Sequence, residues 1–265
     1  MEYKEICLAV KDLAIEAGKF IREQHLNREG FRIETKGKHN FVTEVDKQTE
    51  LLLVKKLALL LPESGFIAEE GTSSKKGERL NWVIDPLDGT TNFIHGAPPF
   101  AVSIGLLDND ELVAGVIYEI NEDACFYAWK GGGAYLNGKA IRVSQVPSID
   151  ESLIATGFPY SNYEHIEAFM ETVDWFMKNS HGLRRLGSAA TDIAYVACGR
   201  YDGFYEYGLS PWDVAAGIVI LREAGGRVTD FQGKNDYLFG GEIICSNGLN
   251  HDEFQQTVYR MIHKG

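Results

Sequence analysis

Two aspartates three positions apart, Asp85 and Asp88, lie in the stretch of the chain with the strongest chemical character. The apolar residues 82–84 before them predict a short buried strand. We expect this strand to break at Pro86, because proline cannot donate to a strand ladder. Both carboxylates can then point into one space, with the Leu87 carbonyl between them as a third oxygen. Hard oxygen ligands clustered in this way suit Mg²⁺.

The three residues that follow have the character of a phosphate-binding site. Gly89 offers an approach free of a side chain, and Thr90 and Thr91 offer two hydroxyls. Their successive backbone N–H groups fall where the pattern predicts the start of a helix, a position that favours anions. The sequence therefore predicts a bound metal ion and a bound phosphate side by side.

The uninterrupted block Asp85-Pro-Leu-Asp-Gly-Thr-Thr-Asn-Phe93 resembles the central motif of the inositol monophosphatase family, which are magnesium-dependent, lithium-sensitive phosphomonoesterases. The wider superfamily includes fructose-1,6-bisphosphatases and nucleotide 3′-phosphatases, and its branches vary just after the glycine. Residues 90–93 resemble the inositol monophosphatase branch. The resemblance implies the sugar-phosphatase fold, an α/β (α+β layered) architecture of alternating α-β-α-β-α layers, with the metal ions between two halves.

Two acids upstream of the block gain a role from the resemblance. Glu69 ends a short apolar run, and alone the pair Glu69-Glu70 would be an ordinary solvated turn. The resemblance implies that Glu69 binds the first metal ion and helps to position water. Asp46 precedes a helical pattern, where a helix-capping acid is an equally good interpretation. The resemblance implies that it orients Thr90 beside the attacking water.

A second signature, residues 206–217, supplies two further acids. Asp213 follows Ser210 and Pro211 at a predicted helix start, so it could stabilise the helix dipole without any metal. The resemblance instead implies that Asp213 binds a second metal ion. It also implies that Glu206 hydrogen-bonds a ring hydroxyl of the substrate.

The resemblance thus assigns a complete set of site residues. Catalytic roles fall on Glu69, Thr90 and Asp46. The metal ligands are Glu69, Asp85, Leu87, Asp88 and Asp213, holding two Mg²⁺ and a further weakly bound ion. The substrate contacts are Gly89, Thr90, Thr91, Gly187, Ala189, Glu206 and Asp213. Residues 36–43 correspond to a loop that closes over the metals, although Asn40 stands where many relatives have an acid.

Composition narrows the class of protein. The chain has 265 residues, 45% of them hydrophobic, which is enough for one large core or two closely packed halves. A net charge of −12 without a Lys/Arg-dense run argues against a nucleic-acid partner. The four cysteines lack zinc or redox spacing, and neither a secretory signal nor a membrane span is evident, so we expect a cytoplasmic protein with free thiols.

The remaining pattern predicts a single phosphatase domain with two sub-halves. Residues 1–147 form an antiparallel-rich sheet covered by two helices, and residues 148–265 form a second α/β layer. A helical stripe in the second half is expected to be core, and consists of Ile166, Phe169, Met170, Val173, Phe176 and Met177. Family members are commonly homodimers, so we expect a homodimer.

The resemblance favours hydrolysis of myo-inositol 1-phosphate and related inositol monophosphates. Other small phosphate esters remain alternatives, namely fructose 1,6-bisphosphate, the 2′-phosphate of NADP and adenosine 3′,5′-bisphosphate. A protein of another class, a non-catalytic inositol-phosphate binder or scaffold, is the further alternative. The presence of Thr90, Asp46 and Glu69 favours an enzyme, because a binder would not need to activate water.

Overall fold

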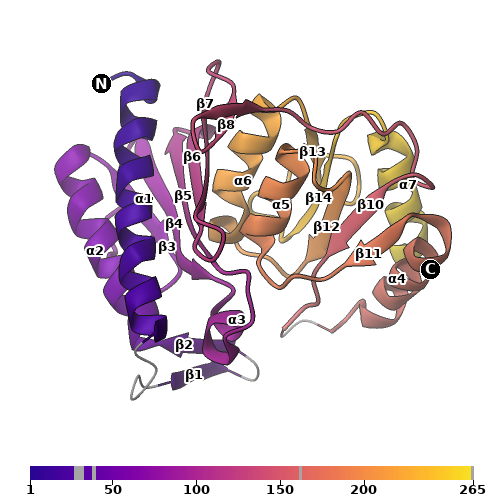
Figure 1. Cartoon of the computed structure of the whole chain (residues 1–265), viewed down its shortest axis with the longest axis horizontal. Helices are drawn as coiled ribbons and strands as arrows, with labels where there is room; N and C mark the ends of the chain where they lie inside the picture. The colour runs from indigo at the N-terminus through magenta and orange to yellow at the C-terminus, as the bar shows by residue number, and fades with distance from the viewer. Residues whose placement is uncertain (27–32, 38–39, 161–162, 264–265) are drawn as a thin grey trace.

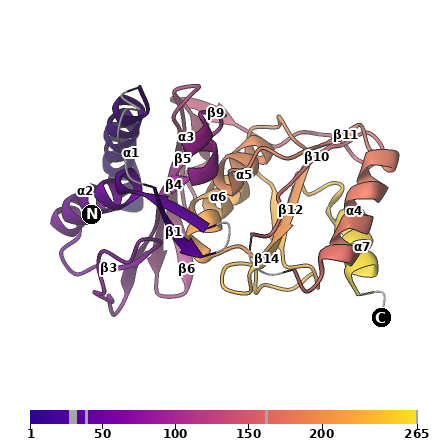
Figure 2. The ribbon, with the colours of Figure 1, turned by 90° about the horizontal axis from the view of Figure 1, so that it is seen from below.

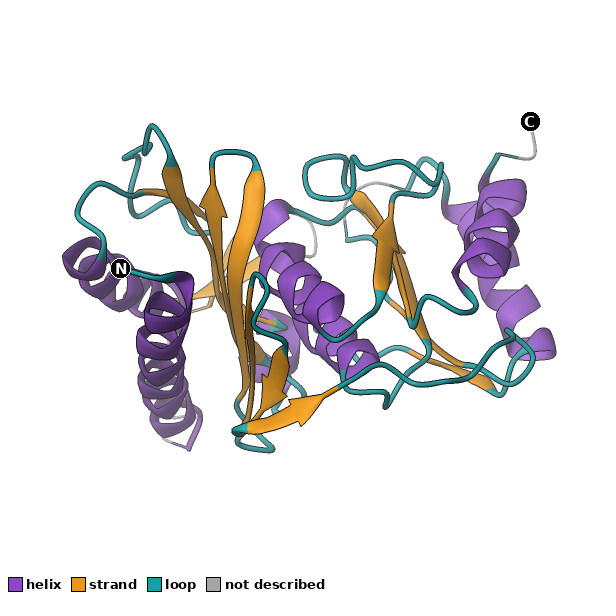
Figure 3. Ribbon diagram, turned by 90° about the horizontal axis from the view of Figure 1, so that it is seen from above, coloured by secondary structure: helices purple, strands orange, loops and turns teal. Residues whose placement is uncertain are grey.

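Helices and sheets alternate in five layers in this computed structural model, which describes residues 1–26, 33–37, 40–160 and 163–263 (Figures 1 and 3). The outer helices α1 (Tyr3–Leu26) and α2 (Glu44–Leu60) cover one face of the first sheet. The middle layer is α5 (Ala189–Ala197) and α6 (Pro211–Glu223). Beyond the second sheet lie α4 (Ile166–Asn179) and α7 (His251–Ile262). The predicted layered fold is confirmed.

The first sheet has seven strands that follow one another almost in sequence order. Its first two strands pair in parallel and all later neighbours pair antiparallel. Asn137 and Gly138, with φ of 48° and 82°, form the tight turn between the last two strands. In order across the sheet, the strands are β3 (Gly65–Ala68), β4 (Leu80–Asp88), β5 (Ala101–Asp108), β6 (Glu111–Glu119), β7 (Ala124–Trp129), β8 (Ala134–Leu136) and β9 (Lys139–Ile141).

The second sheet is mixed and has five strands. Its strands in order across the sheet are β11 (Gly182–Arg184), β10 (Leu153–Thr156), β12 (Gly203–Tyr207), β14 (Glu242–Ser246) and β13 (Arg227–Thr229). The parallel neighbours of β10 alternate with helices along the chain, as the sequence predicts for a second α/β layer. None of the helices in the described ranges is long and apolar enough to span a membrane.

Strand β4 does not end at Pro86, and that expectation is wrong. Pairing with β5 resumes at Asp88 after a register shift, because Asp85 lies opposite Ser103 and Asp88 opposite Ala101. One extra residue on β4 forms a bulge at this point. Pro86 lies within the bulge, where a missing N–H group costs no ladder hydrogen bond.

The segment that the resemblance identifies as a loop over the metals lies in two antiparallel strands, β1 (Ile33–Gly37) and β2 (Asn40–Thr43), apart from residues 38–39, which lie outside the described ranges. One expectation about α4 needs correction. In α4, Phe169, Val173 and Phe176 are buried as predicted, but Met170 is 46% and Met177 59% exposed. The helix buries a stripe narrower than the run of apolar residues, because one face alone meets the sheet and α7.

A close approach between β6 and α6 determines where the middle layer lies. A Cβ on Gly115 would come within 2.4 Å of the Ala216 carbonyl oxygen, which is backbone and cannot swing aside. Gly115→Ala is therefore expected to destabilise the fold by roughly 1–3 kcal/mol, the usual cost of overpacking. Denaturant unfolding would measure this loss. An unchanged midpoint would show that the two elements can separate freely.

A buried histidine makes stability depend on pH. The His251 side chain lies between Thr229 and Ser246, its Nε2 and Nδ1 being 3.1 and 2.8 Å from their hydroxyl oxygens, and burial lowers its pKa from 6.5 to about 4. The folded state therefore binds fewer protons than the unfolded state between these values, and stability falls as the pH drops through 6.5. We expect a loss of about 2 kcal/mol between pH 7.5 and pH 5.

His251→Gln provides the measurement of this effect, because glutamine does not titrate. The variant should show a flatter dependence of unfolding free energy on pH than the wild type over the same interval. Parallel curves for the two proteins would contradict a neutral buried imidazole.

Candidate active site

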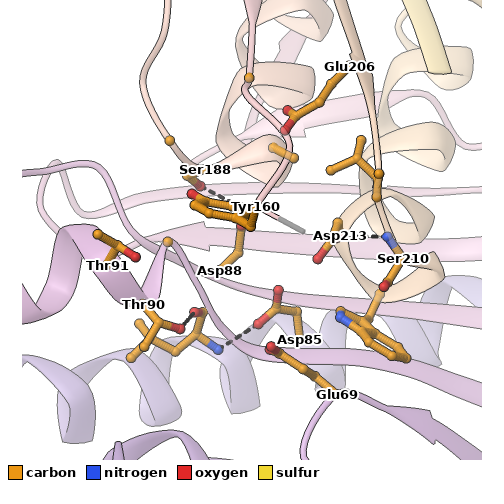
Figure 4. A pocket seen from close by; sticks show the side chains of 18 of the residues that line it. Glu69, Asp85, Asp88, Thr90, Thr91, Tyr160, Ser188, Glu206, Ser210 and Asp213 are labelled. Carbon is orange, nitrogen blue, oxygen red and sulfur yellow. Dashed lines mark hydrogen bonds between the residues drawn. The ribbon is translucent and has the colours of Figure 1, made fainter. Parts of the chain in front are cut away.

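A cavity of about 240 Å³ lies where the end of β4, the end of β12 and the starts of α5 and α6 converge (Figure 4). Of the residues assigned from the sequence, Asp46 does not line the cavity but touches a residue that does. The lining contains the other eleven assigned residues: Glu69, Asp85, Leu87, Asp88, Gly89, Thr90, Thr91, Gly187, Ala189, Glu206 and Asp213. Residues distant in sequence are thus brought into one cavity.

Three carboxylates form the centre of the cavity. Asp85, Asp88 and Asp213 each offer one oxygen atom, and these three atoms all lie within 4.8 Å of one another. Residues three apart on a regular strand face opposite sides, so the bulge in β4 explains how Asp85 and Asp88 share one side. Asp213 comes from the first turn of α6. This donor set fits a divalent cation bound by oxygen.

The charges of these acids oppose one another. Burial, followed by the charges of Glu69, Asp88 and Asp213, raises the pKa of Asp85 well above its usual value. Burial raises the pKa of Asp88 to about 6, and burial with repulsion from Asp88 raises that of Asp213 to about 7. A bound cation would remove this repulsion and favour the ionised form of all three groups.

Two of these aspartates also accept hydrogen bonds from residues at a helix start. Asp88 Oδ2 accepts hydrogen bonds from Ser188 Oγ at 2.6 Å and from the Ala190 N–H at 2.8 Å, which fastens β4 to α5. Asp213 Oδ2 accepts from the Ser210 N–H at 2.7 Å and completes a capping box. Asp213 therefore both caps α6 and belongs to the acid cluster.

Asp46 likewise combines two roles. It closes a capping box at the start of α2 with Thr43, and its Oδ1 accepts from Thr90 Oγ at 2.9 Å. The same Thr90 hydroxyl lies 3.1 Å from the Leu87 carbonyl oxygen. Since the hydroxyl has one hydrogen and both neighbours accept it, the oxygen lone pairs of Thr90 remain to accept a hydrogen bond from the cavity.

The predicted phosphate-binding turn begins the short helix α3 (Thr90–His95). Gly89 has a φ of 90°, a backbone conformation that favours glycine. The Asn92 side-chain amide donates to the carbonyl oxygens of Pro99 and Leu186, each at 2.8 Å. Asn92 thereby ties this turn to the segment that leads into Gly187.

Glu206 closes the opposite side of the cavity and is buried at the end of β12. Burial, then the charge of Asp213, raises its pKa well above the usual range, while Arg185 partly offsets the shift. A Cβ on Gly157 would lie 2.0 to 2.1 Å from the carboxyl atoms of Glu206. The glycine therefore provides the room that this carboxyl group occupies.

Arg185 and Tyr160 line the cavity, and the sequence analysis gave neither of them a role. Arg185 is the only cationic side chain among the lining residues that the structure describes, and it donates to the Tyr160 hydroxyl at 3.0 Å. Its guanidinium also lies over the rings of Phe158 and Tyr160, with distances of 5.5 and 5.9 Å to the ring centroids. The signal available was the Arg184-Arg185 pair just before Gly187, but paired arginines usually indicate a solvated surface.

Proteins with similar sequences carry several names. The chain is 41% identical over 235 residues, 88% of each chain, to a Vibrio cholerae protein named Nus factor SuhB. It is 40% identical over 235 residues, again 88% of each, to an inositol-1-monophosphatase of Mesorhizobium japonicum. It is also 40% identical over 228 residues, 86% of each, to a Thermotoga maritima protein named fructose-1,6-bisphosphatase/inositol-1-monophosphatase.

Solved structures and a family model extend the likeness to almost the whole chain. The extragenic suppressor protein suhB of Bartonella henselae superposes with a TM-score of 0.90 at 37% identity, covering 98% of this chain and 99% of that one. SaIMPase-II, solved with bound inositol monophosphate, gives 0.81 at 28% identity, covering 96% and 94%. The model of the inositol monophosphatase family matches residues 2–263. The chain therefore belongs to the inositol monophosphatase family.

Proposed function

We propose that the protein is a Mg²⁺-dependent phosphomonoesterase that hydrolyses myo-inositol 1-phosphate and related inositol monophosphates to inositol and phosphate. The observation that carries this proposal is the convergence of the Asp85, Asp88 and Asp213 oxygens beside the Thr90 hydroxyl. Oxygen ligands for a hard cation and a hydroxyl able to orient water then lie in one cavity, which is the requirement for metal-assisted attack on a phosphate ester.

Two ions would be held by overlapping groups of ligands. Glu69, Asp85 and the Leu87 carbonyl would hold the first, and Asp85 would share the second with Asp88 and Asp213. When bound, Mg²⁺ supplies positive charge that eases deprotonation of water and neutralises the departing ester oxygen.

The chain's own residues orient the reactants. Thr90, whose hydrogen is directed to Asp46, would accept a hydrogen bond from the attacking water and aim it at phosphorus. The N–H groups of Gly89, Thr90 and Thr91 would hold the phosphate oxygens in line with that water. Asp85 would join the two ion sites, so that attacking and leaving oxygens are held at a fixed separation.

The leaving group would occupy the side of the cavity near Glu206, Gly187 and Ala189. A carboxyl beside two small residues suits a hydroxyl-bearing ring, which supports an inositol ester. Related proteins support more than one ester: SaIMPase-II has been solved with inositol monophosphate and with 2′AMP, and the Thermotoga maritima relative is also named a fructose-1,6-bisphosphatase. Fructose 1,6-bisphosphate, NADP and adenosine 3′,5′-bisphosphate therefore remain alternative substrates.

Phosphate release from these four esters, each measured with Mg²⁺ and with a chelator, tests the proposal. We expect chelator-sensitive turnover in which myo-inositol 1-phosphate is the preferred substrate. Preference for another ester would keep the metal mechanism and change the substrate. Turnover that persists after exhaustive chelation would contradict the metal mechanism itself.

Glu206→Gln tests the assignment of the leaving-group side. Because the side chain is buried and would contact a ring hydroxyl, we expect kcat/KM for myo-inositol 1-phosphate to fall by about 10-fold to 100-fold, as for loss of one hydrogen bond to a charged group. Glycerol phosphate, which has no ring, should be affected much less. Equal losses on both substrates would mean that Glu206 does not recognise the ring.

A second candidate function is that of a non-catalytic inositol-phosphate binder or scaffold, which is favoured by a Vibrio cholerae relative that is named Nus factor SuhB and not named as a phosphatase. The two functions are separable in the same assay. No phosphate release from any ester at saturating Mg²⁺, by a protein that still binds the ion, would favour this second function.

A further inference from the structure

Helix α2 carries a second buried acid whose role is not explained by the motif. Asp46 and Glu50 lie four residues apart, one helical turn, and both side chains are fully buried. Two carboxylates in this arrangement repel each other, and burial of each is costly unless it is hydrogen-bonded. Asp46 meets Thr43 and Thr90. Glu50 must therefore have other partners that offset its burial.

Those partners all belong to one short segment. Glu50 Oε2 accepts from the Glu70 N–H at 2.7 Å. Glu50 Oε1 accepts from both the N–H group and the hydroxyl of Thr72, each at 2.7 Å. Between them, Gly71 has a φ of 64°, so the chain turns around the carboxylate. A single buried anion thus organises the turn that follows Glu69.

The same contact restrains Glu69 from its C-terminal side. The Glu69 N–H donates to the Ile84 carbonyl of β4 at 3.2 Å, which restrains the residue from its N-terminal side. The next amide in the chain, that of Glu70, is held by Glu50. The backbone on both sides of Glu69 is therefore restrained, and its side chain lines the cavity (Figure 4).

We infer that Glu50 is a positioning residue that holds Glu69 in place to bind a divalent cation. This inference rests on the proposed function, because it takes Glu69 as a ligand. Through Asp46 and Glu50, one helix then orients both the hydroxyl that would direct water and the acid that would hold the first ion. Groups that restrain metal ligands typically change metal affinity by 10-fold to 100-fold when they are removed.

Glu50→Gln tests the hydrogen bonds of Glu50 while keeping the size of its side chain. Glutamine has almost the same shape but only one acceptor oxygen, so its amide must face either the Glu70 N–H or the two donors of Thr72. If the glutamine oxygen keeps the two hydrogen bonds from Thr72, the glutamine NH2 group faces the Glu70 N–H, and two donors then meet beside Glu69. We expect the Kd of Mn²⁺ for the metal-free protein, measured by calorimetry, to rise at least about 10-fold. With saturating Mg²⁺, kcat should recover to within a few-fold of the wild type.

Two further variants complete the test. Thr72→Val removes one of the three donors, so its Kd should rise by a smaller factor, about 3-fold, and it serves if Glu50→Gln does not fold. Val258→Ala, in the core of α7, should lower the unfolding midpoint and leave the Mn²⁺ Kd unchanged.

The outcomes distinguish this inference from the proposed function. Wild-type protein that neither binds Mn²⁺ nor releases phosphate would overturn the proposed function. Wild-type protein that does both, together with a Glu50→Gln variant that loses stability but keeps the wild-type Kd, would overturn the positioning role alone. An unchanged Kd in Thr72→Val, where Glu50→Gln cannot be prepared, would also overturn it.

Discussion

Asp85→Asn is expected to lower kcat by at least about 1,000-fold, because a loss of ~4 kcal/mol of transition-state stabilisation has that effect on the rate. Burial, followed by the charges of Glu69, Asp88 and Asp213, raises the pKa of Asp85. Asp85 is the one carboxylate placed to join both proposed ion sites, so a neutral amide would weaken both at once. Phosphate release at saturating Mg²⁺ measures the loss.

The same variant should leave the metal-free fold intact. Without a cation, the charge of Asp85 is buried among other acids, so a neutral side chain relieves repulsion. In the presence of a chelator, we expect Asp85→Asn to unfold at the same temperature as the wild type or at a higher one. Added Mg²⁺ should raise the unfolding temperature of the wild type much more than that of the variant.

Asp110→Asn provides the matched control for loss of one negative charge, because Asp110 is exposed in the turn between β5 and β6. It should behave as the wild type in both assays. If Asp85→Asn kept turnover within 10-fold of the wild type, Asp85 would not join the two ion sites. A large fall in its metal-free unfolding temperature would mean that the activity loss reflects the fold.

The sequence alone was enough to predict those features of the structure that neighbouring residues determine. The block from Asp85 to Phe93 contains a strand end, a glycine turn and a helix start, all of them features of neighbouring residues. Ser210 and Pro211 likewise begin α6 because capping and the fixed φ of proline act within one turn. Such features depend little on the rest of the fold.

Other features depend on partners distant in sequence. The continuation of β4 past Pro86 requires β5 to pair on the far side of the bulge. The exposure of Met170 and Met177 reflects how wide a face α7 and the second sheet cover, which periodicity alone does not show. The burial of Glu50 was missed because a glutamate within a helix is ordinarily solvated, and its donors lie about 20 residues away along the chain.

The other large expected effect concerns the hydroxyl of Thr90. Thr90→Val keeps the shape of the side chain and removes the oxygen that would orient water, so we expect kcat to fall by about 100-fold to 10,000-fold, the usual range for loss of positioned proton transfer. Thr90→Ser keeps the hydroxyl and should remain within about 10-fold of the wild type. Steady-state phosphate release for both variants checks this expectation.

Asp46 should act through that same hydroxyl. Asp46 Oδ1 accepts a hydrogen bond from the Thr90 hydroxyl, so the lone pairs of the Thr90 oxygen face the cavity. Asp46 Oδ2 accepts from the Thr43 N–H and so helps to cap α2. In Asp46→Asn, the side-chain NH2 group can replace Oδ1 and donate to the Thr90 oxygen. The Thr90 hydroxyl would then no longer direct its lone pairs toward the cavity, and kcat would fall. Because both residues control one hydrogen bond, the double variant Asp46→Asn/Thr90→Val should be no slower than Thr90→Val alone.

Stability supplies the second half of this comparison. When the amide nitrogen of Asp46→Asn faces Thr90, its oxygen still accepts from the Thr43 N–H, so the α2 cap becomes neutral but is not lost. We expect this variant to lower the unfolding free energy by about 1 kcal/mol, and Thr90→Val to cost less because α3 keeps its backbone bonds. Rate losses that multiply in the double variant would mean that Asp46 affects catalysis by a route other than Thr90. Rate losses that coincide, with separate effects on stability, would place the helix cap and the water-orienting hydroxyl on the two oxygens of one carboxylate.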